Sequence, residues 1–312
     1  MAITTFNYPL YEYAVGWFKR QAANPVDFIA PTLKVKGMLG TFPRYPQGYA
    51  FRSANTNRSL YEPPTTVNID AEEVPFKLKD KGLRVPVDDT ELLAAGDATG
   101  DQIAQAKSAS MLSIWRTSLI QEALEDFRAG VAAESGKGNW SSSSTDPIAE
   151  LRELFQAFRE ANGVAPNRML FSDNAWSTLA GNAEVMDMVS FNDAKVITPN
   201  LLLKLLHFEP GTEGAPQILC STVPVAAAKP GPGVGFAGTN ALGADVWLTY
   251  VDEGNQVGDM CGLRQMRQNQ DAPIDSVITV RDELAHTTFY EVKGAVYNAV
   301  TAPSCVKRLI IS

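Results

Sequence analysis

DQIAQAKSASMLSIWRTSLIQEALEDFRAGVAAE, residues 101–134, is the stretch that decides what kind of fold this chain can adopt. Its apolar residues recur mostly at steps of three or four, the pattern of an amphipathic helix with one buried face. Such a helix would be about 50 Å long, and Gly130 weakens only its last turn. The apolar positions of the predicted face are Ile103, Ala106, Met111, Ile114, Trp115, Leu119, Ile120, Leu124 and Phe127.

The residues before this helix are predicted to bury little of their own surface. Four prolines and several aromatic residues lie between Asn24 and Phe51, which favours extended or turning chain. From Thr65 to Asp88, short apolar alternation surrounds a Lys81-Gly82 turn signal, which predicts a two-stranded hairpin. An isolated hairpin is marginal in water, so we expect it to lie on a neighbouring copy. This order of elements suggests assembly and not catalysis.

A second helix after the long one carries strong end signals. Asp146 is predicted as its N-cap and Pro147 as its first residue, and Asn162-Gly163 is predicted to end it. Its apolar stripe consists of Ile148, Leu151, Leu154, Phe155 and Phe158.

The remainder is predicted to pass from helices to strands. A short buried strand is expected at Arg168–Phe171, then a helix capped by Asp173 or Asn174, then a helix from Thr198 through Leu206. The chain becomes β-rich from residue 216, and helices and strands in separate runs predict an α+β fold. The strand candidates are ILCSTVPV at 218–225, DVWLTYV at 245–251, SVITVRDEL at 276–284, TTFYEVKGAVYNAV at 287–300 and VKRLII at 306–311.

Composition and charge indicate a globular chain with a basic N-terminal part and an acidic remainder. With 312 residues and 45% hydrophobic residues, the chain can bury a substantial core. Residues 1–60 carry seven Lys or Arg against two Asp or Glu, whereas the whole chain has a net charge of −8. A basic arm and an acidic body favour docking between copies, or else the arm charges only keep it solvated. We find no signal peptide or membrane span in the sequence.

The three cysteines are expected to be reduced and mostly buried. Cys220, Cys261 and Cys305 are odd in number, far apart and never in a CxxC spacing. That pattern supports neither a disulfide framework nor a zinc site.

The residues that could carry catalysis have simpler interpretations. The chain has two histidines; His207 ends an apolar helix as a packing or capping residue, and His286 lies in a strand pattern. The glycine run GPGVGFAGTNALG at 231–243 follows no strand and lacks the ending of a phosphate-binding loop. We therefore predict no catalytic residue, no cofactor-binding residue and no metal ligand.

Charged clusters are also predicted to be structural. The pairs Glu72-Glu73, Asp88-Asp89 and Asp252-Glu253 lack the ligand spacing of a calcium loop and are expected in solvated turns. Lysines at 77, 79 and 81 could in principle be acylated by a neighbour, but a solvated hairpin face explains them better.

The order of these segments resembles that of the major capsid proteins of tailed bacteriophages, which have the Hong Kong 97-type fold. The resemblance spans nearly the whole chain, and although each motif is loose, their sequence and spacing together are fairly specific. The segments that carry it are 27–52, FKLKDKGLRVPVDD at 76–89, MLSIWRTSLIQEALEDF at 111–127, 139–182, TPNLLLKLLHF at 198–208 and DVWLTYVDEG at 245–254.

The resemblance implies a division of the chain. The parts are an N-terminal arm at 1–48, an extended β-hairpin loop at 49–90, a peripheral domain at 91–143 and 276–294 with a spine helix at about 101–134, and an axial domain at 144–275 and 295–312.

The resemblance also implies partners and a location. Copies would form pentamers and hexamers, and these would build an icosahedral shell. The shell would be the capsid of the virion and would enclose packaged double-stranded DNA, which it would contact without reading the base sequence. Assembly would take place in the cytoplasm of the host. The arm starts almost at Met1, without a long scaffolding segment, so either a separate scaffolding protein serves the chain or none is needed. A portal and a decoration protein are further implied partners, and no membrane is.

Two alternatives stay open. An encapsulin-like bacterial compartment would share the fold but enclose cargo enzymes. An enzyme using carboxylates and the loop at 227–243 would instead be a monomer or small oligomer that a ligand stabilises.

Overall fold

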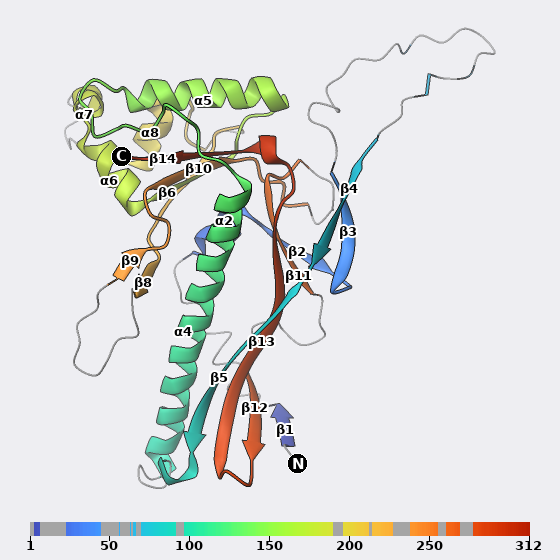
Figure 1. The fold of residues 1–312 in the computed structure, drawn as a ribbon. Coiled ribbons are helices and arrows are strands. Elements are labelled where there is room, and N and C mark those ends of the chain that lie inside the picture. The colour runs from blue at the N-terminus through green and yellow to red at the C-terminus, as the bar shows by residue number, and fades with distance from the viewer. Residues whose placement is uncertain are drawn as a thin grey trace.

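A computed structural model of the chain describes residues 3–6, 23–44, 70–91, 97–189, 196–211, 214–226, 238–254, 260–268 and 277–312, and four isolated positions between 56 and 66. Figure 1 shows a broad body of helices around a small sheet and an elongated limb in which one long helix lies along a larger sheet. Helices and strands fall largely in separate runs, as the sequence predicts for an α+β fold.

The limb is built on the long helix α4, Asp97–Gly130, which begins and ends four residues earlier than predicted. It ends at Gly130, where an added Cβ would lie 2.6 Å from Val300 Cγ2, so glycine permits close packing there. Of the predicted apolar face, Ala106 and Ile114 are exposed, and that part of the prediction is wrong. The buried apolar residues of α4 are Ala104, Met111, Leu112, Trp115, Leu119, Ile120, Ala123, Leu124 and Phe127.

One face of a six-stranded sheet packs against α4. The strand β13 runs through its centre, pairing with β5 along one edge and with β12 and β11 along the other. β1 extends the sheet beyond β12, and β2 pairs in parallel with β11. The bounds are β1 Ile3–Phe6, β2 Thr32–Val35, β5 Lys79–Asp88, β11 Leu263–Gln268, β12 Val277–Asp282 and β13 Thr287–Val300.

The predicted hairpin across Lys81-Gly82 is wrong. Both residues lie inside the continuous strand β5, where Gly82 is opposite Lys293 of β13. The two-stranded ribbon that does form pairs β3, Leu39–Arg44, with β4, Glu72–Lys77. A partner more than two hundred residues away outweighed the local turn signal, because β13 offers ten paired positions to β5. Most of residues 45–69, which the extended loop was predicted to include, lie outside the described part.

The prediction that residues 24–51 are extended is also wrong in part. Asn24 caps a short helix, α2 at Pro25–Ile29, by accepting a hydrogen bond from Val26 N at 3.0 Å. Val26 and Ile29 are buried against the second half of α4 and the sheet of the body. This segment therefore belongs to the subunit core and not to a free arm.

The body consists of a four-stranded sheet and four helices, α5 to α8. Its sheet has the order β14-β10-β6-β7, in which only β6 and β7 are parallel. The helices pack their apolar side chains on this sheet (Figure 1). The bounds are α5 Pro147–Asn162, β6 Arg168–Ser172, α6 Asp173–Gly181, α7 Ala183–Val189, α8 Pro199–Leu205, β7 Gln217–Ser221, β10 Asp245–Thr249 and β14 Val306–Ile310, preceded by a 3-10 turn at Pro303–Cys305.

The end signals of the body helices were mostly read correctly. The cap of α5 at Asp146, its first residue Pro147 and its left-handed Gly163 (φ 70°) are confirmed, as is the Thr198 cap of α8. The cap of α6 is Ser172 and not Asp173 or Asn174, because the Ser172 hydroxyl accepts from Ala175 N at 3.1 Å. A small antiparallel pair, β8 Pro224–Ala226 and β9 Gly238–Asn240, completes the described strands.

Several elements were not predicted at all, among them α7 and β11. The helix α7 is only seven residues long, too short for a clear period. The strand β11 reads LRQMRQ and shows no apolar alternation, yet Arg264 and Gln265 are buried in it. Arg264 is satisfied there because its guanidinium donates to the carbonyls of Asp252 and Gly254 at 3.0 and 2.8 Å.

The limb is joined to the body through a buried carboxylate. Asp245, at the start of β10, is 3% exposed and accepts hydrogen bonds from Arg128 Nε at 2.7 Å and Arg308 Nε at 3.3 Å. Arg128 also donates to the carbonyl of Ala241 at 2.7 Å. The end of α4, the body sheet and β14 are therefore held at one point.

We predict that Asp245→Ala lowers the free energy of unfolding by about 3–5 kcal/mol, because it leaves two guanidinium groups without their shared anion. Urea unfolding followed by circular dichroism measures this. Glu153→Ala is the matched control: its carboxylate accepts from Lys137 at 2.6 Å but is 70% exposed, so its removal should cost less than about 1 kcal/mol. Equal losses in the two variants would contradict the role given to Asp245.

Candidate assembly surfaces

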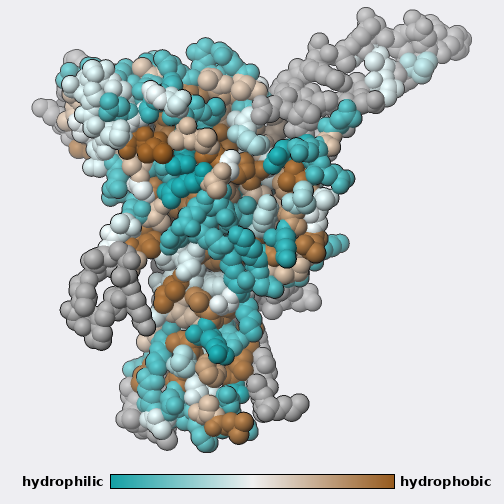
Figure 2. Space-filling model, in the orientation of Figure 1, coloured by the Kyte–Doolittle hydropathy of each residue, from teal (hydrophilic) through white to brown (hydrophobic). Residues whose placement is uncertain are grey.

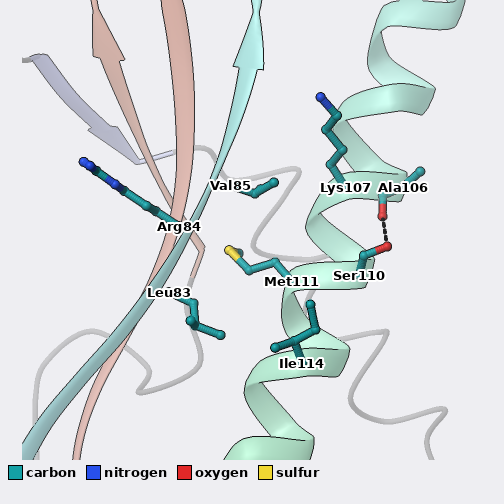
Figure 3. A pocket seen from close by; sticks show the side chains of 8 residues that line it. All are labelled: Leu83, Arg84, Val85, Ala106, Lys107, Ser110, Met111 and Ile114. Carbon is teal, nitrogen blue, oxygen red and sulfur yellow. Dashed lines mark hydrogen bonds between the residues drawn. The ribbon is translucent and has the colours of Figure 1, made fainter. Parts of the chain in front are cut away.

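An apolar groove of about 350 Å³ runs between α4 and β5 on the limb. Figure 3 shows Leu83 and Val85 of β5 on one side and Met111 and Ile114 of α4 on the other. Ile114 is 58% exposed although it is a large aliphatic residue on a well-packed helix. An exposed apolar groove of this kind marks a surface that another segment can cover.

Two charged residues, Arg84 and Lys107, are among the residues that line the groove. Arg84 points to the opposite side of β5 (Figure 3), where its guanidinium carbon lies 4.8 Å from the centre of the Phe289 ring. Lys107 pairs with Glu91 at 2.5 Å. The floor is therefore apolar, and the nearby charges are already engaged. In Figure 2, hydrophobic patches interrupt the hydrophilic surface along the limb.

Two lysines of the predicted hairpin, Lys79 and Lys81, join β5 to α4; Lys79 remains 57% exposed, as predicted, whereas Lys81 is only 15% exposed. Lys81 donates to Glu122 of α4, and Lys79 lies 3.5 Å from the same carboxylate and 3.8 Å from Asp126. Burial of Glu122 opposes ionisation, but the hydrogen bond and charge of Lys81, aided by Lys79, lower its pKa. These lysines are thus ion-pair partners of acidic residues on α4. Lys77 lies in β4 as an exposed residue.

The ribbon β3–β4 is tied to the end of β13 through Arg44 and carries an exposed apolar residue. Arg44 donates to the carbonyls of Val300 and Thr301 at 3.0 and 3.2 Å. Phe42 is buried, whereas Leu39 is 69% exposed. The ribbon is therefore fixed at its Arg44–Glu72 end and offers apolar surface to a partner at its Leu39–Lys77 end.

The turn between β12 and β13 presents a second exposed apolar residue. Leu284 is 93% exposed, and Asp282 holds the turn by accepting from Leu284 N and Ala285 N at 3.0 and 3.3 Å. His286 lies in this turn with φ 48°, so the prediction that it belongs to a strand is wrong. A rigid turn that exposes a leucine is suited to contact with another molecule.

The predicted acidic pairs are separate in space and each has a local role. Glu72 lies 3.8 Å from Arg44, and Asp89 pairs with Arg281 at 2.7 Å. Glu253 pairs with Arg168 at 2.5 Å. Among the described residues, no group of three or more His, Cys, Asp or Glu could hold a metal ion.

The remaining candidates are a loop and the cysteines. Residues 227–237 of the glycine-rich loop lie outside the described part of the chain. Cys261 and Cys305 are buried, as expected, but Cys220 is exposed. Burial of the sulfur raises the pKa of both Cys220 and Cys261 to about 11, so both stay protonated near neutral pH. Over the same described ranges, no helix is long and apolar enough to span a bilayer.

The groove between α4 and β5 was not predicted from the sequence. Its walls come from β5 and α4, and the stripe pattern had assigned Ile114 and Ala106 to the buried face. The number of apolar positions gave no warning, because nine is no more than one buried face of a helix this long holds.

Comparison with solved structures identifies the fold. A phage-related protein from Bordetella bronchiseptica matches with a TM-score of 0.69 at 18% identity, over 98% of this chain and 97% of that one. The capsid of cyanophage P-SCSP1u matches with 0.54 at 12% identity, over 94% and 89%. The SrpI encapsulin of Synechococcus elongatus matches with 0.52 at 14% identity, over 95% and 94%. No family model and no curated protein matches the sequence.

At these identities the likeness concerns the fold, and it extends over nearly the whole chain on both sides. One known fold contains all three parts: the long helix on a six-stranded sheet, the β3–β4 ribbon and the helical body. The chain therefore has the Hong Kong 97-type fold of the tailed-bacteriophage major capsid proteins, as its sequence resemblance predicted.

Proposed function

We propose that this chain is a bacteriophage major capsid protein, which assembles through pentamers and hexamers into an icosahedral shell around double-stranded DNA. The observation that carries the proposal is the match over 98% of the chain to a phage-related protein, with a cyanophage capsid sharing the same fold. Exposed apolar residues on the groove, the ribbon and the β12–β13 turn support it, since each would be covered in a shell.

In this proposal the protein is structural and has no catalytic, cofactor-binding or metal site. We shorten the proposed arm to residues 1–22, because α2 and β2 belong to the core, and keep a peripheral domain at 91–143 and 276–294 and an axial domain at 144–275 and 295–312. We narrow the extended loop to residues 39–77, because β5 pairs along β13 and thus belongs to the sheet of the limb. The chain beyond residue 60 has a net negative charge, as the DNA phosphates do, so its contact with DNA would be weak and non-specific.

The proposed location is the virion capsid, after assembly in the cytoplasm of a bacterial host. The partners are other copies of the chain, a portal, and a scaffolding or decoration protein where assembly uses one. An encapsulin-like compartment has the same fold, but the match to the phage-related protein (TM-score 0.69) exceeds that to the encapsulin (0.52).

Expressed alone and concentrated, the protein should form closed shells, visible by negative-stain electron microscopy and confirmed by light scattering on the same sample. Shells recovered from a phage-producing host should contain nuclease-resistant DNA. Shells filled with a protein cargo would instead support the compartment. Small species at every concentration and salt would contradict unaided self-assembly.

We expect Ile114→Asp to leave the folded subunit intact but to raise the protein concentration needed for assembly at least about tenfold, because a charge would enter an apolar contact. Stability should change by less than about 0.5 kcal/mol, since Ile114 is exposed in the free subunit. Ser113→Asp, at an exposed neighbour outside the groove, is the control. Normal assembly of the Ile114 variant would exclude the groove as an interface.

Deletion of residues 2–22 should abolish shells and leave folded subunits, because it removes β1 and the chain before α2 but no described part of the core. A deletion through residue 45 should unfold the subunit instead, since Val26, Ile29 and Leu33 are buried. Circular dichroism and electron microscopy separate the two effects. Normal shells after the shorter deletion would exclude a role of the arm.

A further inference from the structure

A second hollow, of about 490 Å³, lies on the body between α5 and the end of α8. Its floor is aromatic: the rings of Phe155 and Phe208 lie 5.3 Å apart between centroids, tilted by 53°. Arg152 and Arg159 line it from positions seven residues apart, and therefore on one face of α5. The hollow combines an apolar floor with a cationic wall.

The charges of this wall are only partly used inside the subunit. Arg152 donates to the carbonyl of Leu205 at the end of α8. Glu160, the acidic residue of the lining, accepts from Gln156 at 2.8 Å. No hydrogen bond or ion pair of the Arg159 side chain is found within the described residues. A carboxylate from outside would therefore find an available guanidinium.

His207 at the edge of this hollow occupies a position that suits glycine. Its φ is 64°, its N–H donates to Lys204 O at 3.0 Å, and Phe208 N donates to Leu203 O at 2.8 Å. These two bonds form the usual helix end whose left-handed residue is glycine, because a side chain there costs free energy. The chain nevertheless carries an imidazole at this point, which is consistent with a use of the side chain beyond the fold.

The helix α7 presents the complementary chemistry. Val185 and Val189 are buried in the body, while Met186, which is 41% exposed, and the exposed Glu184 border the outer face of the helix on its two sides. The helix contains two acidic residues and no basic one. Its outer face therefore carries both an apolar side chain and negative charge.

The hollow and α7 lie at different ends of α5. Asn182, just before α7, donates through its side-chain amide to the carbonyls of Trp140 and Thr145 at 2.8 and 3.3 Å. This places the start of α7 beside the N-terminal end of α5, whereas Arg159 lies in the last turn of α5. Two different surfaces that fit each other form head-to-tail contacts, which close into rings when the rotation permits.

We propose that α7 of one copy docks in the α5–α8 hollow of the next copy around a capsomer ring. Met186 covers the Phe155–Phe208 floor, and Glu184 pairs with Arg159. An apolar floor suits a methionine better than a nucleic-acid phosphate, so a second copy is the occupant that the chemistry favours. This inference rests on the proposed shell function and adds the residues that hold a ring together.

The first test exchanges the charges. Arg159→Glu and Glu184→Arg should each raise the protein concentration needed for assembly about tenfold, and the double variant should restore it to within about threefold, measured by sedimentation velocity. Assembly of either single variant at the wild-type concentration would overturn the pairing, as would a double variant no better than the singles. The variant His207→Gly should have the melting temperature of the wild type or a higher one, but should need a higher protein concentration to assemble. If it assembles at the wild-type concentration, His207 takes no part in the contact.

The second test separates this contact from the shell itself. In a Cys220→Ser background, Met186→Cys combined with Gln156→Cys should give a ladder of disulfide-linked subunits on oxidation, and either cysteine alone should not. A ladder without shells would support the contact and contradict the proposed function. Shells without a ladder would support the function and overturn the contact.

Discussion

The buried carboxylate of Asp245 sets the relation between the two parts of this molecule. Arg128 reaches it from the last turns of α4, and Arg308 reaches it from β14. A charge buried to 3% exposure is tolerated only when its partners compensate for lost hydration, and here two guanidinium groups do so. Because the directions of these hydrogen bonds are fixed, the limb cannot rotate freely against the body.

That rigidity is suited to a shell. Many copies must repeat one geometry, while small differences in angle are accommodated at the contacts. The rigid elements are the spine helix with its sheet and the helical body, whose cores are continuous through α2 and the second half of α4. Exposed apolar residues lie on these rigid elements and on their connections. Among the described residues they are Leu39 of the ribbon, Ile114 of α4, Met186 of α7, Val196, Leu284 of the β12–β13 turn and Ile310 of β14.

The surfaces that could contact other copies were predicted less well than the fold. From the sequence, Ile114 was assigned to the core and the lysines at 77, 79 and 81 to a solvated face. Ile114 is exposed instead, and of the three lysines only Lys81 is largely covered, with 15% of its side chain exposed. In each case the error follows from one wrong strand. Once β5 lies beside α4, its lysines meet Glu122, and its apolar residues leave a groove that Ile114 borders.

The sequence by itself determined the elements whose signals are local. The limits of α5, the Thr198 cap, the existence of α4 and most β-strands of the second half were correct, because caps and hydrophobic periods act within a few residues.

Only the tertiary structure decided which strands pair with each other and which residues remain exposed outside the core. β5 pairs with β13 instead of turning at Lys81-Gly82, α2 is folded into the core, and the polar strand β11 lies inside a sheet. The physical reason is that strand pairing and burial depend on partners that can lie more than two hundred residues away, and those contacts outweigh local preference.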